Sequence, residues 1–274
     1  MIVLDFSGTL SLAATEYGRE TMLLEKLKEA GLWELGIDSA QRFWDELANP
    51  IWEVGSTTAQ GYRALMGDRL CRFSGGREGC PGEAQIRASA AAFVDDYFNH
   101  STIDPAWQPV LRWLAVQPQG IVLIATDHYA EATGHVMGQL HALGVESIPA
   151  EWPRQAGQVL VANSADLGCW KAGQSFWQVI KRAQGIENLA IVGVVDDFGF
   201  NEPTGDGYTD PAKIARRQMQ MTEALADAFS AQVRVLPFFL DTGKPANRIE
   251  RADAYQKLID RAASFARTVM AVGA

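Results

Sequence analysis

Short apolar runs alternate with helical stripes along most of the chain. Five runs are apolar at nearly every position, as strands buried on both faces of a sheet are, and so predict strands: residues 1–4, 121–125, 158–162, 189–195 and 233–240. The segments between the last four carry apolar residues at helical spacing. Repeated strand–helix units predict an α/β fold with a doubly wound parallel sheet and right-handed crossovers.

The link after the first predicted strand differs from the others. From Leu12 to His100 apolar residues recur three and four positions apart, and no stretch alternates as a strand does. Residues 71–83 are glycine-rich and polar and predict a loop. Parallel strands need a far shorter connection. We therefore predict a core of residues 1–12 and 101–274, with an inserted all-helical cap of residues 13–100. The aromatic residues of the cap are interpreted as packing of its interior.

Composition argues against several classes of partner. The 274 residues carry a net charge of −9, which disfavours nucleic acid, because phosphate backbones need clustered Lys and Arg. The apolar runs are too short to span a bilayer, and no secretion signal precedes the first strand. Three cysteines, an odd and sparse set, fit a reducing compartment. We expect a cytoplasmic protein without a membrane partner, and its oligomeric state stays open.

Polar residues gather where the predicted strands end, and the ends of parallel strands share one edge of the sheet. Asp5 follows the first strand, and the backbone of the next turn, Ser7-Gly8-Thr9, can approach a ligand closely. The later strands are followed by further polar residues: Thr126 and Asp127, then Lys171, then Asp196 and Asp197. We expect these residues at one solvent-facing edge, with His128 in the turn after Thr126.

This set of residue types suits phosphoryl transfer. Clustered carboxylates repel one another unless a divalent cation lies among them, and Mg²⁺ prefers oxygen ligands and bridges to phosphate. Lys171 and Thr126 would hold phosphoryl oxygens, because this chemistry depends on positioning and charge neutralisation. A carboxylate such as Asp5 can attack phosphorus and form an acyl phosphate. The predicted cofactor is Mg²⁺, and the predicted substrate is a small phosphorylated molecule.

Four stretches, taken in order, resemble the motifs of the haloacid dehalogenase-like (HAD) superfamily. They are Asp5-Phe6-Ser7-Gly8-Thr9, the strand ending at Thr126, residues 164–171 followed by Phe176, and residues 192–197. The helical segment after the first motif is similar to the family's cap. The resemblance implies a Rossmann-like core and a Mg²⁺-dependent hydrolase or phosphotransferase.

The same resemblance implies roles for individual residues. Asp5 would be the nucleophile, and Thr126 and Lys171 would bind phosphate. The metal would be held by Asp5, Asp196 and Asp197, together with the backbone carbonyl of Ser7. We expect Gly8, Thr9 and Asp127, which lie in the same turns, to contact the phosphate as well.

Position 7 departs from the family pattern. Phosphatases of the family usually carry a second Asp there as general acid and base, and a serine hydroxyl cannot exchange protons usefully near neutral pH. The prediction is a phosphatase that acts on a small metabolite through a phospho-Asp5 intermediate. The alternatives are a phosphonate- or halide-cleaving relative, or a protein that binds a phosphorylated ligand without turnover.

Two features of the sequence bear on the halide-cleaving and phosphonate-cleaving alternatives. Dehalogenation needs no metal, so the Asp196-Asp197 pair argues against it. Phosphonate cleavage through an imine needs a lysine in the cap, for which Lys26 and Lys28 are the candidates. Which of Asp196 and Asp197 contacts the metal directly stays open, as does whether Asn201 or Glu202 replaces the family's later acidic residue.

Overall fold

Six parallel strands form one sheet in the computed structural model, which describes residues 1–74, 81–118, 120–203, 210–240 and 248–272. The strand order is β3-β4-β2-β1-β5-β6, and every neighbouring pair is parallel. The strands are β1 (Ile2–Leu4), β2 (Val122–Thr126), β3 (Ser147–Pro149), β4 (Val159–Asn163), β5 (Ile191–Asp196) and β6 (Gln232–Pro237). The predicted α/β class with a parallel sheet is therefore confirmed.

Two strands differ from the prediction by more than one or two residues at an end. The sequence does not predict β3, because its three half-buried residues at the edge of the sheet are too few to form an apolar run. β6 ends at Pro237 rather than at residue 240. Proline lacks a backbone N–H and is tolerated in a sheet mainly at edges, which is where β6 lies.

Helices cover both faces of the sheet. One face carries α7 (Gln108–Ala115), α8 (Glu131–Ala142) and α12 (Arg248–Val272), and the other carries α10 (Gln174–Ala183) and α11 (Pro211–Phe229). Alternate residues along β1 and the residue before it point to opposite faces of the sheet. Ile2 and Leu4 pack toward the first set of helices, and Met1 and Val3 pack toward the second. Two short turns, η2 (Pro105–Trp107) and α9 (Ser164–Leu167), lie in the connections. None of the described helices combines the length and the apolar character that a membrane crossing requires.

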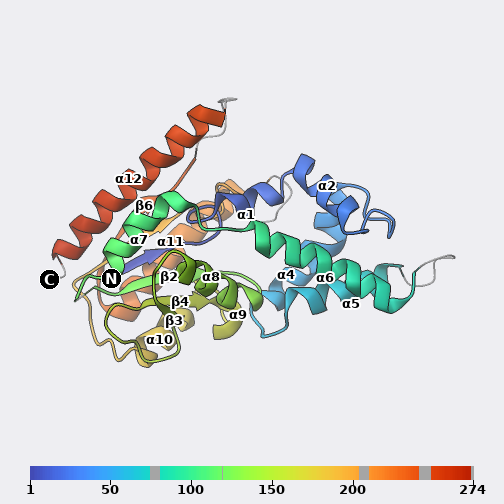
Figure 1. Cartoon of the computed structure of the whole chain (residues 1–274). Helices are drawn as coiled ribbons and strands as arrows, with labels where there is room; N and C mark the ends of the chain where they lie inside the picture. The colour runs from blue at the N-terminus through green and yellow to red at the C-terminus, as the bar shows by residue number, and fades with distance from the viewer. Residues whose placement is uncertain (75–80, 119, 204–209, 241–247, 273–274) are drawn as a thin grey trace.

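The helical block, residues 13–100, lies to one side of the sheet (Figure 1). Its described elements are α1 (Leu12–Tyr17), α2 (Glu20–Glu29), α3 (Ala40–Arg42), the π-helical turn η1 (Phe43–Ala48), α4 (Asn49–Gly55), α5 (Tyr62–Ser74) and α6 (Glu83–His100). They enclose a separate apolar core that includes Leu27, Ile37 and Val94. The predicted loop over residues 71–83 is wrong for residues 71–74, which continue α5 with Leu70 and Ser74 buried one turn apart, and for Glu83, which begins α6. Residues 75–80 of that prediction lie outside the described part.

Residues that follow β2 join the helical block to the sheet. The Tyr129 ring stacks on Tyr62 with ring centroids 3.9 Å apart, and both rings belong to the apolar core of the block. The Glu131 carboxylate accepts hydrogen bonds from the backbone N–H groups of Tyr62 (2.8 Å) and Arg63 (3.2 Å), at the start of α5. These contacts hold the block against the edge of the sheet where the strands end.

Candidate functional site

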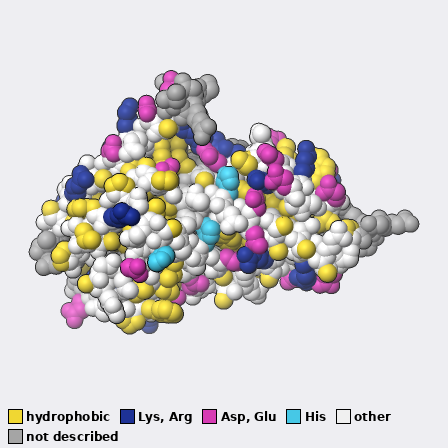
Figure 2. Space-filling view, viewed as in Figure 1, with side chains coloured by type: hydrophobic (Ala, Val, Ile, Leu, Met, Phe, Trp, Pro, Cys, Tyr) yellow, Lys and Arg dark blue, Asp and Glu magenta, His cyan; other side chains and the backbone are white. Residues whose placement is uncertain are grey.

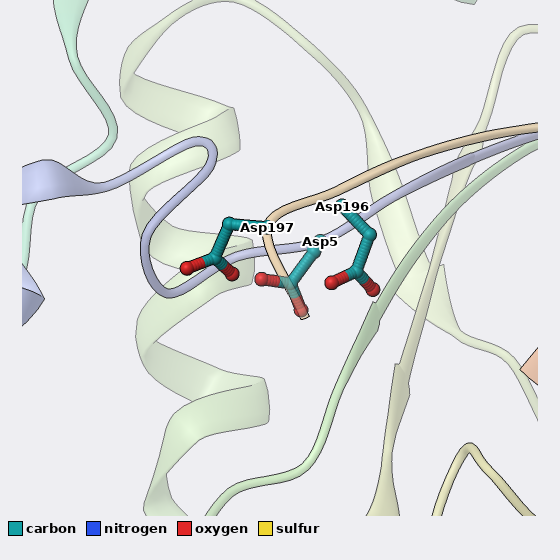
Figure 3. A group of neighbouring side chains, drawn as sticks. All are labelled: Asp5, Asp196 and Asp197. Atoms are coloured by element: carbon teal, nitrogen blue, oxygen red, sulfur yellow. The ribbon is translucent and has the colours of Figure 1, made fainter. Parts of the chain in front are cut away.

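Three carboxylates meet at the carboxyl ends of β1 and β5 (Figure 3). Asp5 follows β1, Asp196 ends β5 and Asp197 comes next; the pairing of Leu4 with Val195 brings the two strand ends side by side. Each residue offers a carboxylate oxygen within 4.8 Å of the other two. Their exposed fractions are 4%, 1% and 1%. The residues thus gather as expected, but the expectation of a solvent-facing edge is wrong, because all three side chains are buried.

The Lys171 ammonium lies inside this cluster. It donates hydrogen bonds to Asp5 Oδ1 (2.5 Å) and to Asp196 Oδ2 (2.8 Å). The backbone around it is held on both sides: the Asp127 carboxylate accepts from the Lys171 N–H (2.9 Å), and Trp177 Nε1 donates to the Lys171 carbonyl (2.7 Å). Asp127 therefore positions Lys171, and its predicted contact with phosphate stays a prediction.

Charge in the cluster is unbalanced when its three carboxylates are ionised, since the one ammonium then leaves two negative charges in excess. Burial raises the pKa of Asp5 well above its usual value, and Asp196 raises it further, whereas Lys171 opposes the rise. Burial, Glu202 and Asp196 likewise raise the pKa of Asp197. Burial alone would lower the pKa of Lys171, but Asp196 and Asp5 hold it well above its ordinary value, so this side chain is a cation. A divalent cation would supply the missing positive charge.

The Ser7–Thr9 turn packs against Asp197. Gly8 has a φ of +74°, and a Cβ atom at this position would lie 2.4 Å from Asp197 Oδ2, so only glycine fits. The Thr9 hydroxyl accepts a hydrogen bond from the Asp197 N–H (3.2 Å). The structure thus gives Gly8 and Thr9 contacts that position Asp197, while their contact with phosphate stays a prediction.

Asn201 and Glu202 have different surroundings. The Asn201 side-chain amide donates to the carbonyls of Gly8 (2.7 Å) and Phe238 (2.8 Å), and its oxygen accepts a backbone N–H at 3.0 Å, so it ties three loops together. Glu202 lines the cavity described next and accepts a hydrogen bond from the Ser7 hydroxyl (2.7 Å). Of the two, Glu202 is the residue whose carboxylate faces the site.

A cavity lies between the helical block and the edge of the sheet, and part of the cluster opens into it. The predicted site residues that line it are Asp5, Ser7, Thr126, Asp127, Lys171 and Asp197. Gly8, Thr9 and Asp196 lie behind this surface and do not line the cavity. Thr126 ends β2, the strand beside β1, and its side chain is 1% exposed. The structure therefore brings the predicted site residues together, some in the cavity wall and the others directly behind it.

His128 and Tyr97 form a hydrogen-bonded pair in the cavity wall, with His128 Nε2 2.9 Å from the Tyr97 hydroxyl. His128 Nδ1 accepts from the Tyr129 N–H (2.8 Å), so the ring proton is on Nε2, which donates to Tyr97. Burial, with a smaller effect of His135, lowers the pKa of His128 to about 3 and keeps the ring neutral. The sequence draws attention to His128 through its place after β2, but it gives no signal for Tyr97.

Aromatic side chains of the helical block also line this cavity, among them Tyr17, Phe43, Trp44 and Phe93. The interpretation of these rings as interior packing is therefore incomplete, because rings such as Phe93 belong to the apolar core and to the cavity wall at once. The density of aromatic residues in the block is the only sequence signal for this wall.

The fold and the site together define an α/β protein with a buried acidic cluster at the edge where parallel-sheet proteins bind ligands. Comparisons with family models, with curated proteins and with solved structures found no match to this chain. Its function is therefore inferred from the residues of the site.

Proposed function

We propose that this protein is a Mg²⁺-dependent phosphate-ester hydrolase of the HAD type, acting on a small phosphorylated metabolite through a phospho-Asp5 intermediate. The observation that carries the proposal is the Lys171 ammonium, which donates to both Asp5 (2.5 Å) and Asp196 (2.8 Å) within a cluster of three buried carboxylates. A nucleophilic carboxylate, a fixed cation and further carboxylates beside a cavity are the parts that phosphoryl transfer needs.

The donor set fits Mg²⁺. Carboxylate oxygens are the ligands this ion prefers, and the cluster holds two negative charges more than Lys171 balances. Asp5 and Asp197 line the cavity and would hold the ion from that side, with Asp196 and the Ser7 carbonyl completing the protein ligands. When bound, the cation would offset the charge of the phosphoryl oxygens.

In the proposed reaction each residue of the site has a separate role. An Asp5 oxygen attacks phosphorus, the ester P–O bond breaks, and the leaving oxygen takes a proton from water. Lys171 favours the ionised form of Asp5 and offers its remaining N–H to a phosphoryl oxygen, and the Thr126 hydroxyl binds another. Water then attacks the phospho-Asp5 phosphorus and gives a proton to the solvent, and the P–O bond to Asp5 breaks, which releases phosphate and restores the Asp5 carboxylate.

The surroundings of Lys26 and Lys28 give no support to phosphonate cleavage through an imine. Lys26 pairs with Glu29 (2.8 Å) and Asp96 (3.2 Å), and the Lys28 ammonium lies 4.5 Å from the centroid of the Trp33 ring. Neither lysine lines the cavity. Ligand binding without turnover remains the second candidate, because Ser7 offers a hydroxyl, held by Glu202, where a proton-transferring carboxylate is expected.

A hydrolysis assay with purified protein tests the proposal. We expect p-nitrophenyl phosphate and members of a phosphorylated-metabolite panel to be hydrolysed with Mg²⁺ and not with EDTA. Asp5→Asn keeps the side-chain shape but cannot form an acyl phosphate, so the rate should fall by about a thousandfold or more. Asp95→Asn, in the ion pair with Arg63 on the helical block, is the matched control and should keep the wild-type rate.

Three outcomes separate the candidates. Radioactive phosphate trapped on Asp5 after an acid quench would support the covalent route. Hydrolysis by Asp5→Asn at the wild-type rate would rule that route out. Tight binding of inorganic phosphate with no turnover of any ester would favour the ligand-binding alternative.

A further inference from the structure

The wall that the helical block contributes to the cavity is almost wholly apolar. None of the described Lys, Arg, Asp or Glu residues of the block lines the cavity, and Asn49 supplies its one side-chain amide there. Seven aromatic side chains of the block line it, among them Tyr17, Phe43, Trp44 and Phe93. The charged residues in the wall come from the strand ends, from the loops that follow them and from α11, which contributes Arg217, so the cavity has one charged end and one aromatic end.

The aromatic end is held in a defined shape. The Tyr17 ring meets Phe93 edge to face with centroids 5.5 Å apart, and Phe43 lies 5.3 Å from Phe93. The Tyr17 hydroxyl donates to the Asp96 carboxylate (2.9 Å), so this residue presents its ring rather than its oxygen. A preformed apolar cavity with few polar groups favours a rigid apolar ligand over one covered with hydroxyls.

Trp44 adds one polar feature to this end. Its indole Nε1 is buried and has no acceptor among the residues that the structure describes. The ring is seated closely, because a Cβ atom on Gly18 would lie 3.2 Å from Trp44 Cζ2 and 2.7 Å from Pro203 Cγ. A buried donor without an acceptor is costly, and a ligand acceptor in the cavity would satisfy it.

We infer that the organic part of the substrate is an aromatic ring bearing a hydrogen-bond acceptor, which Trp44 Nε1 binds. This inference rests on the proposed function, because the phosphate of such an ester must lie at Asp5 and Lys171. A sugar phosphate or a nucleotide would bury several hydroxyl groups against rings that offer them few partners. The site therefore selects an aryl-type phosphate ester, and Trp44 is a specificity-determining residue.

Titration calorimetry with Mg²⁺ and four non-hydrolysable probes tests the inference. The probes are inorganic phosphate, 2,3-dihydroxypropylphosphonate, benzylphosphonate and 4-acetylbenzylphosphonate. We expect benzylphosphonate to bind about tenfold more tightly than the dihydroxypropyl compound, because its ring leaves water. The acetyl oxygen should add about fivefold through one hydrogen bond.

Variants of Trp44 isolate the hydrogen bond. Trp44→Phe should remove the fivefold gain from the acetyl group and leave inorganic phosphate binding unchanged. Trp44→His, which keeps a ring N–H, should restore part of the gain. Trp152→Phe is the matched control, since Trp152 is 60% exposed and does not line the cavity. Thermal unfolding of each variant checks that the fold is retained.

The outcomes distinguish this inference from the proposed function. Equal or tighter binding of the dihydroxypropyl compound, or an acetyl gain that survives Trp44→Phe, would overturn the inference and leave the phosphatase proposal standing. A fifth probe, neutral 4-acetylbenzyl alcohol, tests whether the aromatic site binds a ligand that has no phosphorus group. If it binds in a Trp44-dependent way while no phosphorus compound binds, the aromatic site is retained and the proposed function fails; if nothing binds, both fail.

Discussion

Gly8 and Asp197 are in contact across the two strand ends that form the site. A Cβ atom on Gly8 would lie 2.4 Å from Asp197 Oδ2, and the Gly8 backbone has a φ of +74°. The Asp197 carboxylate also accepts hydrogen bonds from the N–H groups of Gly199 (3.2 Å) and Asn201 (2.8 Å). Asp197 is thus fixed by backbone groups and by the absence of a side chain at position 8.

Gly8→Ala should therefore disturb the proposed metal site as well as the fold. We expect the free energy of unfolding to fall by about 3 kcal/mol, combining backbone strain with displacement of Asp197. Gly185→Ala is the matched control, because Gly185 has a φ of +61° but no atom within 4 Å of the added Cβ; it should cost about 1 kcal/mol. Mg²⁺ binding, measured by calorimetry, should weaken only in Gly8→Ala. Equal effects of the two changes would contradict the contact.

The sequence predicts the sheet well because buried parallel strands leave a strong pattern. Every residue of β2 and of β5 is buried, and each appears as an apolar run. Asp5, Lys171 and Asp196 could be grouped because strand ends share one edge. β3 shows the limit, since three half-buried edge residues form no pattern.

Contacts between distant segments could not be predicted in the same way. The Ser7–Glu202 hydrogen bond joins residues 195 positions apart, and the Trp44 ring reaches the cavity from a π-helical turn. The first contact joins two loops outside the helical block, and the second depends on how the block docks on the sheet; a periodicity within one segment encodes neither. The burial of Asp196, which is 1% exposed, also involves a residue distant in the sequence, because Lys171 donates a hydrogen bond to its carboxylate.

Asp5→Asn should raise the stability of the metal-free protein. Burial, with Asp196 as the next cause, raises the pKa of Asp5 above its unfolded value. The ionised form is therefore disfavoured in the fold, and wild-type stability is lost as pH rises from about 4 through the raised pKa. The neutral amide avoids this loss, so the melting temperature in EDTA should rise by a few degrees at pH 8 and by less at pH 5.

With Mg²⁺ we expect the wild type to have a higher melting temperature than Asp5→Asn. The ion would offset the charge of the carboxylates in the wild type, whereas in Asp5→Asn it would lose a ligand. Asp253→Asn, an exposed change on α12, is the control and should respond to Mg²⁺ as the wild type does. If the melting temperatures of wild type and variant are the same with and without Mg²⁺, that result would argue against a metal at this cluster.

His128 should make the protein less stable in mild acid. Burial lowers its pKa to about 3, below the ordinary value of 6.5. As pH falls below 6.5 the unfolded chain takes up a proton that the folded ring does not, so stability is lost by up to about 1.4 kcal/mol per pH unit. His128→Asn keeps an acceptor for the Tyr129 N–H but removes this proton uptake. Its free energy of unfolding should vary less than that of wild type between pH 6.5 and 4.5, and parallel curves would contradict a buried neutral ring.

Proton transfer at position 7 can be tested without changing the charge of the site. The Ser7 hydroxyl donates to Glu202 Oε1 (2.7 Å), so Ser7→Asp alone would bring two carboxylates into contact. The double variant Ser7→Asp/Glu202→Gln moves the carboxylate from position 202 to position 7 and keeps the net charge. A positioned acid–base group contributes about a hundred- to ten-thousandfold. We therefore expect the double variant to hydrolyse an alkyl phosphate at least about tenfold faster than wild type.

The gain should be smaller with p-nitrophenyl phosphate, because that leaving group departs without protonation. Glu202→Gln alone is the control: it removes a carboxylate and supplies none at position 7, so it should bring no gain. A sharp loss of alkyl phosphate turnover in this single variant would mean that Glu202 already transfers the proton in the wild type. If the double variant lowers both rates alike while Mg²⁺ affinity is unchanged, Ser7 has a positive role in a different reaction, and binding without hydrolysis becomes the better account of the site.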